Sequence, residues 1–398
     1  MINKDLIFVG GVMPESMFDE IKNMGSNIDY AGNKFQLSLI EGLSEIYDSI
    51  TVVSAPLIAS YPESKTLIWK GKTIQYKDNV KIIITGYFNL PYVKMLSKCV
   101  RIFRNLRKNI RPCDFIIYSP HSPYIAGSWP FLKKGVKSCF ILPDLPEFMR
   151  KSSNPIYKVA KKIDHSVIDY CAKRINSYIL FSPYMKDRFD IGEKPYTVIE
   201  GIYQEPNNGR EGRKLVNSNE NVVLYTGRAD ERYGIGLLLE AFKGIKDASL
   251  RLWIRGDGDT IAKVNELSKS DHRIKHIGML SPEDLRQLQK DAKVLVNPVS
   301  SQEEFTKYFF PSKTMEYLAS GTPTVMSRLK CMPEEYGKYV FYYDEDTPES
   351  IRQKIIEVCN LSPEKIRTRG EEARAFILSE KNNFIQAKKI KTFFEQLS

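Results

Sequence analysis

Short buried strands alternate with amphipathic helices along most of the chain, and this alternation limits the possible folds more than any other feature. In the first half, apolar runs predict strands at residues 6–9, 50–53, 80–84, 115–118, 138–142, 177–181 and 196–199. Helical spacing of apolar residues predicts helices between them, such as residues 33–47 and 93–110. Strands that alternate with helices form parallel sheets covered on both faces. The predicted fold class is therefore α/β and doubly wound.

The alternation stops once and then starts again. Residues 204–220 are rich in glycine, asparagine and charge, which is typical of an interdomain linker. Beyond them, strands are predicted at 222–225, 250–254, 274–276, 294–297 and 324–326, and helices at 235–243, 259–268, 282–290 and 313–319. We therefore expect two Rossmann-like domains, residues 1–203 and 221–380, and a final amphipathic helix at 381–398. Two such domains facing each other would enclose a cleft, because ligands bind beyond the carboxyl ends of the strands.

Length and composition agree with two soluble domains. The 398 residues exceed a single core of ordinary size. We expect neither a spanning helix nor a signal peptide, because apolar runs are short and the N-terminus lacks a charged region before an apolar one. The six cysteines are scattered without close spacing, which argues against a disulfide framework or a zinc site. A cytoplasmic location is expected.

The net charge of +11 suggests a nucleic acid, an anionic membrane or a phosphorylated substrate as partner. In residues 93–110 the apolar face is predicted to contain Leu96, Cys99, Phe103, Leu106 and Ile110. The opposite, basic face is predicted to contain Lys94, Lys98, Arg101, Arg104, Lys108 and Arg111. A second basic stretch spans residues 158–174. Both stretches fit either solvated helix faces or peripheral attachment to an anionic membrane surface. No nucleic-acid module is recognised, so that partner is not expected.

Residues 310–323, FPSKTMEYLASGTP, predict a helix that starts at an anion-binding turn. Ser312 is a favoured N-cap, and Gly321 ends the helix. First-turn amides without partners and the helix dipole attract an anion, to which Lys313 adds a full positive charge. Glu316, one turn further, can accept hydrogen bonds from a ribose diol. The amides in question are those of Lys313, Thr314 and Met315. An ordinary capped helix is the alternative.

Three further turns follow predicted strands. Residues 225–242 place Arg228 after a glycine turn, where a guanidinium can clamp phosphate oxygens. Residues 251–259 end in a glycine-bearing GDG loop that contains Gly256. Residues 276–280, HIGML, could hold a base through backbone groups and the side chain of Met279. Each turn alone is a weak signal.

In this order the four segments resemble the C-terminal domain of retaining GT-B glycosyltransferases, in particular the large GT4 group. The resemblance is specific over residues 221–326 and looser elsewhere. In the first half, residues 10–14, 33–43, 143–147 and 198–203 look like the subgroup that builds bacterial surface polysaccharides.

The resemblance implies transfer of a sugar from a nucleotide donor, most often a UDP-sugar, with retention of configuration and without a metal or other cofactor. The expected acceptor is lipid-linked or a glycan, and the enzyme would be cytoplasmic or peripheral on the membrane. Arg228 and Lys313 would neutralise the departing diphosphate, while Glu316 would bind the ribose. The amides of Gly10 and Gly11 would approach from the first domain. The other donor-side candidates are Arg232, Gly256, Gly278, Met279, Tyr308, Ser312 and Thr314. The final helix is expected to cross back to the first domain.

Two positions depart from the family. Tyr308 stands where a glutamate often contacts the donor sugar, and Tyr233 stands where a lysine often follows the arginine of the first turn. Arg232, next to Tyr233, could supply part of the missing charge. The alternatives are a catalytically degenerate GT-B protein that binds a partner, and a relative that isomerises or phosphorolyses sugars.

Two residues of the first half are acid–base candidates. His121 follows a strand and is predicted to contact sugar or handle a proton, with a plain loop histidine as the alternative. Asp144 lies at another strand end on the acceptor or sugar side, unless it only caps the next turn. Residues 257–259 and 344–346 imitate a metal-binding DxD motif, but both are predicted loops, so no metal site is expected.

Overall fold

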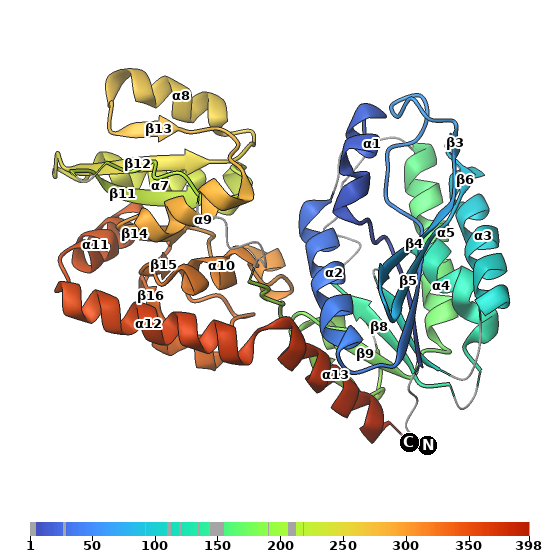
Figure 1. The fold of residues 1–398 in the computed structure, drawn as a ribbon. Coiled ribbons are helices and arrows are strands. Elements are labelled where there is room, and N and C mark those ends of the chain that lie inside the picture. Colours follow the sequence, from blue (N-terminus) through green and yellow to red (C-terminus); the bar gives the residue numbers. More distant parts are fainter. Residues whose placement is uncertain are drawn as a thin grey trace. The chain divides into compact units, whose positions relative to one another are not determined.

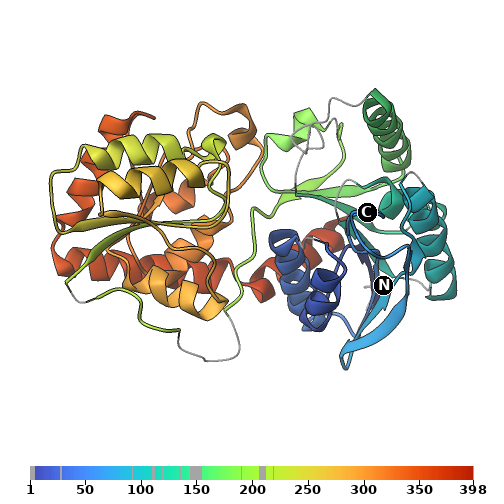
Figure 2. The ribbon, with the colours of Figure 1, turned by 90° about the horizontal axis from the view of Figure 1, so that it is seen from above.

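The computed structural model describes residues 5–26, 29–91, 93–109, 113–118, 121–133, 136–143, 155–189, 191–205, 212–217 and 219–397. The chain divides into two compact units (Figures 1 and 2). Unit 1 contains Met1–Ile202 and Asn383–Ser398, and unit 2 contains Tyr203–Asn382. Each unit is a sheet with helices on both faces, which confirms the predicted α/β class.

Unit 1 is built on an eight-stranded sheet in the order β10-β9-β8-β7-β1-β2-β5-β4. All neighbours are parallel except β4 and β5. The strands are β1 (Asp5–Gly10), β2 (Ser49–Ser54), β4 (Lys72–Lys77), β5 (Val80–Ile84), β7 (Asp114–Tyr118), β8 (Ser138–Leu142), β9 (Ser177–Leu180) and β10 (Tyr196–Val198). The parallel strands read as continuous apolar runs because helices bury both faces. The sequence did not predict β4, an edge strand whose charged and polar side chains are exposed or half-buried.

Helices cover both faces of the unit 1 sheet (Figure 2). One side contains α2 (Tyr30–Ser44) and α13 (Asn383–Gln396), which pack against each other. The other contains α3 (Val93–Asn109), α4 (Ser122–Ser128) and α5 (Pro155–Ala172), which pack in that order. Two short helices, α1 (Phe18–Asn23) and α6 (Met185–Arg188), belong to the same unit. A small two-stranded antiparallel sheet of β3 (Ile68–Trp69) and β6 (Tyr87–Phe88) completes it.

Helix α13 is anchored to unit 1 by buried apolar and polar contacts. Ala387, Ile390 and Phe394 lie in the core beside α2. The Nζ of Lys391 lies 3.2 Å from the Asp114 carboxylate, which also accepts a hydrogen bond from Tyr47 at 2.6 Å. Apolar burial therefore fixes the helix, and the paired charge fixes its register.

Unit 2 is built on a six-stranded parallel sheet in the order β13-β12-β11-β14-β15-β16. Its strands are β11 (Asn221–Thr226), β12 (Leu250–Arg255), β13 (Ile274–His276), β14 (Val294–Asn297), β15 (Thr324–Met326) and β16 (Val340–Tyr342). Its helices are α7 (Ile235–Lys243), α8 (Ile261–Ser270), α9 (Pro282–Asp291), α10 (Lys313–Ser320), α11 (Pro348–Cys359) and α12 (Pro363–Glu380). Apolar residues of α7, α8 and α11 share one core, and those of α9 and α10 share another.

Residues 212–217, which the sequence places in a linker, pack against unit 2 instead. Val216 is buried in the core formed by Val222, Leu224 and Leu288. Arg213 donates through its backbone and its guanidinium to the carboxylate of Asp284, at 2.8 and 2.7 Å. The polar composition of this segment concealed two apolar residues that pack on this core, Leu215 and Val216, and one ion pair.

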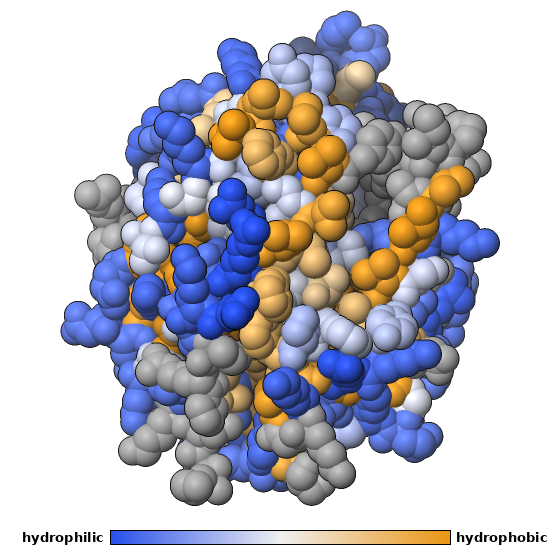
Figure 3. Space-filling view, turned by 90° about the vertical axis from the view of Figure 1, so that its right-hand side faces the viewer, coloured by the Kyte–Doolittle hydropathy of each residue, from blue (hydrophilic) through white to orange (hydrophobic). Residues whose placement is uncertain are grey.

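Helix α3 is rotated about its axis from the predicted orientation: Leu106 is buried and Arg101, Arg104 and Lys108 are exposed as predicted, but Lys94 and Lys98 are buried. Its buried side is formed by Lys94, Lys98, Ile102 and Leu106, whereas Leu96 is 68% exposed. Lys98 donates to the backbone oxygens of residues 55 and 56, at 3.2 and 2.6 Å, so its ammonium is satisfied without a carboxylate. Helix α5 likewise exposes Val159 and Ile163. Apolar side chains are therefore part of the outer surface of unit 1, as Figure 3 shows.

Among the described residues, no helix is long and apolar enough to cross a membrane.

Candidate nucleotide-sugar site

The strand order of each unit reverses at one point, where a crevice for ligands is expected. In unit 2 the reversal lies between β11 and β14, and in unit 1 between β1 and β7. The crevice in such sheets lies beyond the carboxyl ends of the strands. Gly227 and Arg228 directly follow β11 there, and Gly10 ends β1. Predicted site residues thus lie at the switch point of each sheet.

The loops after β11 and β12 are locked together through two glycines. Gly227 has φ 127° and Gly256 has φ 129°, which side-chain-bearing residues rarely adopt. A Cβ on Gly256 would lie 1.8 Å from the backbone oxygen of Gly227. Backbone hydrogen bonds join the loops on either side, from Gly227 to Arg255 at 3.0 Å and from Ala229 to Asp257 at 2.9 Å. Gly256 therefore shapes the site through backbone packing.

The ammonium of Lys313 lies directly against the first of these loops. It donates to the Tyr225 hydroxyl at 2.8 Å and lies 4.0 Å from the centre of that ring. A Cβ on Gly227 would meet the Lys313 Nζ at 2.8 Å. The Tyr225 hydroxyl in turn donates to the backbone oxygen of Arg228 at 2.5 Å. The start of α10 and the end of β11 are thereby connected through one lysine and one tyrosine.

Burial lowers the pKa of Lys313 to about 7, and the Glu316 carboxylate opposes part of that shift. The cause is the desolvation of an ammonium beside an aromatic ring. Near neutral pH the lysine is therefore ready to take up a proton when an anion arrives. A bound diphosphate would restore the charge and raise the pKa again.

Affinity for UDP should fall as the pH rises above about 7. Above its pKa, free Lys313 is neutral, so binding requires uptake of a proton and weakens by up to about tenfold per pH unit. Calorimetry at pH 8 to 9 in two buffers of different ionisation enthalpy measures that uptake. The variant Lys313→Met is the control: any proton uptake that remains on binding comes from groups other than Lys313, such as the nucleotide itself. Equal proton uptake by variant and wild type would contradict the assignment.

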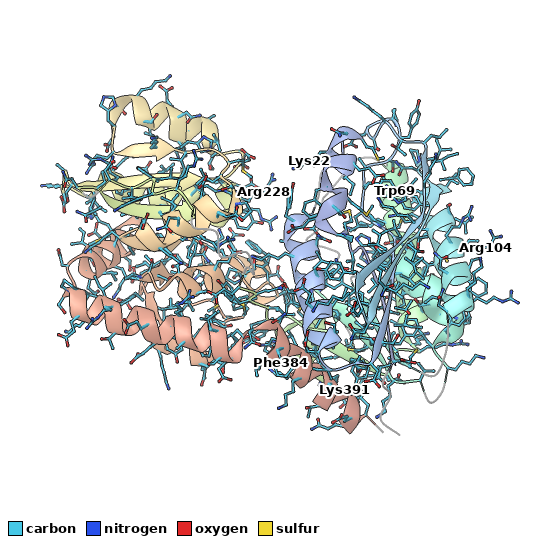
Figure 4. The ribbon with its side chains drawn as sticks, viewed as in Figure 1. Lys22, Trp69, Arg104, Arg228, Phe384 and Lys391 are labelled. Atoms are coloured by element: carbon cyan, nitrogen blue, oxygen red, sulfur yellow. The ribbon has the colours of Figure 1, made fainter. Side chains whose placement is uncertain are left out.

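Arg228 is solvent-facing and already paired. Its side chain is 68% exposed, and its Nε lies 2.5 Å from the Asp230 carboxylate. That ion pair and hydrogen bond raise the pKa of Arg228. Asp230 also accepts a hydrogen bond from the Asp259 amide at 3.1 Å. Figure 4 shows Arg228 projecting from unit 2. To contact a phosphate, its guanidinium has to share or leave Asp230.

The sequence missed a polar group at the end of β12 that interacts with Glu316. Burial lowers the pKa of Arg255, while Glu316 and Asp257 oppose that shift. Its Nε is buried without a hydrogen-bond partner among the described residues. His276 lies near by, with its Nε2 2.8 Å from the backbone oxygen of Gly256. The available signal was the position of Arg255 at a strand end, directly before the GDG loop.

A second missed residue, Tyr317, fixes α10 to the end of β11. Its hydroxyl is buried and accepts a hydrogen bond from the Thr226 amide at 2.8 Å. Because Glu316 and Tyr317 are adjacent on α10, this bond holds the start of the helix beside the β11 turn. A buried tyrosine cannot be distinguished from ordinary core by sequence.

The sequence predicted that three amides at the start of α10 lack hydrogen-bond partners, but two of them are paired. The Thr314 amide donates to the oxygen of Pro311 at 2.8 Å, and the Met315 amide donates to that of Ser312 at 3.2 Å. Ser312 is the N-cap and is exposed, but its side chain makes no capping hydrogen bond. The Thr314 side chain is buried and its hydroxyl lies 3.9 Å from the sulfur of Met326. A tight first turn satisfies these amides, so positive charge at this end comes chiefly from Lys313.

One of the two aromatic departures from the family, Tyr233, lies in a cluster with Phe305 and Arg232. Tyr233 packs edge-on against Phe305 at 6.1 Å, and the Arg232 guanidinium lies 4.6 Å from the Phe305 ring. Tyr308 is half-buried directly after this short helical turn, residues 304–307. Arg232 is exposed, so cation–π contact and not burial orients its charge.

The loop after β13 presents an open backbone. Gly278 has φ 66°, and a Cβ there would meet nothing within 4 Å. Met279 is 64% exposed. An exposed thioether after a left-handed glycine is free to cover a flat ring, as the prediction of a base contact requires.

The remaining predicted site residues, Gly10, Gly11, His121 and Asp144, belong to unit 1. The Gly11 amide donates to the side-chain oxygen of Gln36 at 3.0 Å, so it is occupied and not open to a diphosphate as predicted. Gly10 packs so closely that a Cβ would lie 2.3 Å from the same oxygen. Burial, with Lys98 and Lys94 near by, lowers the pKa of His121 to about 4. His121 is therefore neutral at pH 7. Asp144 lies outside the described residues.

The described residues contain no group of three or more His, Cys, Asp or Glu side chains placed to hold a metal ion.

Solved structures with the same fold extend over essentially the whole chain. Sucrose-phosphate synthase from Thermosynechococcus elongatus shares 15% identity with a TM-score of 0.69, covering 99% of both chains. HepE from Anabaena, solved in complex with UDP, shares 16% identity with a TM-score of 0.64, covering 99% of this chain and 100% of its own. WaaG, a glycosyltransferase involved in lipopolysaccharide biosynthesis, shares 11% identity with a TM-score of 0.62, covering 98% and 100%. The chain therefore has the GT-B fold.

A sequence comparison adds the chemistry to the fold. Residues 220–360 match the family model described as Glycosyl transferases group 1. No curated protein sequence matches the chain significantly. The matched segment contains the β11 and β12 loops, Lys313 and Glu316. Fold and family match together define a glycosyltransferase that uses a nucleotide-sugar donor.

Proposed function

We propose that the protein is a retaining, metal-independent glycosyltransferase of the GT4 type that transfers a sugar from a UDP-sugar to a lipid-linked or glycan acceptor of capsule, exopolysaccharide or O-antigen synthesis. The observation that carries the proposal is Lys313, whose ammonium lies between Tyr225 and the Gly227 turn at the start of α10. The UDP bound to HepE and the lipopolysaccharide role of WaaG support the choice of base and pathway class.

In the proposed reaction the bond between the anomeric carbon and the phosphate oxygen breaks, while the acceptor oxygen bonds to the same carbon and its hydroxyl proton is released. Negative charge grows on the leaving diphosphate. Lys313 stabilises that negative charge. Arg228 and Arg232 are exposed cations whose side chains can also contact the phosphates. These side-chain cations would give the stabilisation that other transferases obtain from a metal.

The direct test is UDP release that depends on both donor and acceptor, together with calorimetric binding of UDP. Turnover with retained configuration supports the proposal. Release of the sugar as a phosphate or an isomer, without an acceptor, points to the phosphorolytic or isomerising alternative. Absence of UDP binding at millimolar concentration favours a degenerate protein, for which Tyr233 and Tyr308 are the specific observations.

Glu316→Gln should raise the KM for the donor by about 10- to 100-fold with a smaller change in kcat. A hydrogen bond to a charged group contributes about 1.5–3 kcal/mol, which corresponds to that range. The measurement is made at pH 6, below the pKa of Lys313 in wild type, and repeated at lower pH, because loss of the Glu316 charge lowers that pKa further. The matched control is Glu364→Gln, an exposed position in the first turn of α12.

A second ligand separates ribose contact from a general effect on the site. The 2′-deoxy form of UDP should bind wild type more weakly than UDP, and the Glu316→Gln variant should scarcely distinguish the two. If the variant discriminates as strongly as wild type, Glu316 does not bind the ribose diol.

A further inference from the structure

Exposed apolar side chains are concentrated in one part of unit 1. Between residues 57 and 100 the described chain exposes more large apolar side chains than in all its other described residues together. Figure 3 shows apolar surface gathered on this face and bordered by hydrophilic side chains. Contiguous apolar patches on soluble proteins usually mark interaction sites.

The two-stranded β3–β6 sheet contributes the first part of this surface. Its two strands pair Ile68 with Phe88 and Trp69 with Tyr87. The second pair is buried, whereas Ile68 and Phe88 are 54% and 47% exposed. A hydrogen bond links β6 to α3: the Phe88 amide donates to the Ser97 hydroxyl at 3.0 Å. An apolar cross-strand pair is therefore held rigidly toward solvent beside α3.

Helix α3 contributes the second part, because its outward stripe changes character along its length. The stripe begins with Val93, Leu96 and Val100, all exposed, and continues at helical spacing with Arg104 and Arg107, also exposed. Burial of Lys94 and Lys98 turns these residues outward. Figure 4 shows Arg104 extending away from the helix.

A basic pocket adjoins the apolar residues. A cavity of about 580 Å³ is lined by residues of β3, β6, β4, β5 and α3. Its lining includes Lys70, Lys72 and Arg101 and contains no carboxylate. Lys72 is paired with Glu20 at 2.8 Å, so Lys70 and Arg101 supply the positive charge available to a ligand. The pocket therefore suits a phosphate group.

We propose that this surface, here called the docking face (Ile68, Phe88, Val93, Leu96 and Val100 with Lys70, Arg101, Arg104 and Arg107), binds an anionic phospholipid bilayer. The five apolar side chains enter the boundary between headgroups and acyl chains, and the four cations contact lipid phosphates. Charge favours this occupant over a second copy of the chain. The α3 sequence contains no acidic residue, so a second docking face would offer no carboxylate to these cations.

The inference rests on the proposed function only in expecting a membrane-bound acceptor, and docking can be measured without turnover. It also differs from a purely electrostatic attachment of a basic helix. Insertion of apolar side chains does not depend on salt, whereas attraction of the rim to anionic lipid weakens with salt. Binding should therefore persist in part at high ionic strength.

Vesicle sedimentation with and without phosphatidylglycerol in phosphatidylcholine tests the face. Ile68→Asp combined with Leu96→Asp should lower partitioning at least about tenfold at both low and high salt, since two apolar anchors are lost. Arg104→Glu combined with Arg107→Glu should lower it about tenfold at low salt and little at high salt. The controls are Ile356→Asp and Lys263→Glu, exposed positions of unit 2 that should change nothing.

A positive readout of insertion comes from tryptophan fluorescence. Phe88→Trp should shift to the blue on vesicles and be quenched by brominated acyl chains, whereas Ile356→Trp should not. The docking face is refuted if wild type does not bind anionic vesicles, or if Ile68→Asp with Leu96→Asp binds like wild type. It is also refuted if that variant instead converts a dimer to a monomer in light scattering. UDP binding should be the same in every variant, so its loss would indicate misfolding, which melting curves check independently.

Discussion

Lys313→Ala is expected to lower kcat for sugar transfer by about 100- to 1,000-fold. Removing one preorganised group that stabilises charge in a transition state commonly has an effect of this size. Lys313 is the cation that the fold places most firmly, through the Tyr225 hydroxyl at 2.8 Å and the Gly227 turn. Arg228 is exposed and paired with Asp230, so it is a poor substitute. Steady-state rates at saturating donor measure the loss.

The variant should fold normally, which makes the rate interpretable. Burial disfavours the charged lysine, and the Tyr225 hydroxyl keeps its bond to the oxygen of Arg228 after the change. The melting temperature should therefore stay the same or rise slightly. Lys290→Ala, an exposed position of α9, is the matched control and should retain full activity. Turnover of Lys313→Ala within about twofold of wild type would place the leaving-group site elsewhere.

The sequence predicted the buried strands well because parallel strands under two helix layers are continuous apolar runs. Strands β1, β11 and β12 each lie where an apolar run predicts them. The short strands β3 and β6 and the edge strand β4 were missed, since short or polar strands lack that signal. Periodicity also failed on α3. It located the helix but not its buried face, because Lys94 and Lys98 have enough length and nearby backbone oxygens to be buried.

Within the candidate site, the sequence could identify residues but not their partners. The contact of Lys313 with Tyr225 joins residues 88 positions apart, and no local pattern encodes it. The Gln36 side chain that occupies the Gly11 amide lies 25 positions from it and is likewise outside any local pattern. Anion-binding amides at a helix start were inferred from capping residues, yet the tight first turn satisfies two of them. Long-range hydrogen bonds and turn geometry are three-dimensional properties that composition and spacing do not fix.

Gly256→Ala is expected to destabilise unit 2 by about 3 kcal/mol or more. A backbone strained for any side chain costs about 1–3 kcal/mol, and a Cβ 1.8 Å from the Gly227 oxygen forces the two loops apart as well. For a unit of this size the melting transition should fall by about 6–12 °C. Affinity for UDP should fall too, because Gly227 lies against the Lys313 ammonium.

Gly278→Ala separates strain from the collision of the two loops. Gly278 also has a positive φ, 66°, but an added Cβ meets nothing within 4 Å, so only about 1–2 kcal/mol should be lost. Scanning calorimetry of both variants measures the loss in free energy of unfolding. Gly256→Ala should lose at least about 1 kcal/mol more than Gly278→Ala. Equal losses would mean that the β11 and β12 loops can part freely. A larger loss at Gly256 that also weakens UDP binding would show that this backbone contact holds Gly227, and with it Lys313, in place for the diphosphate.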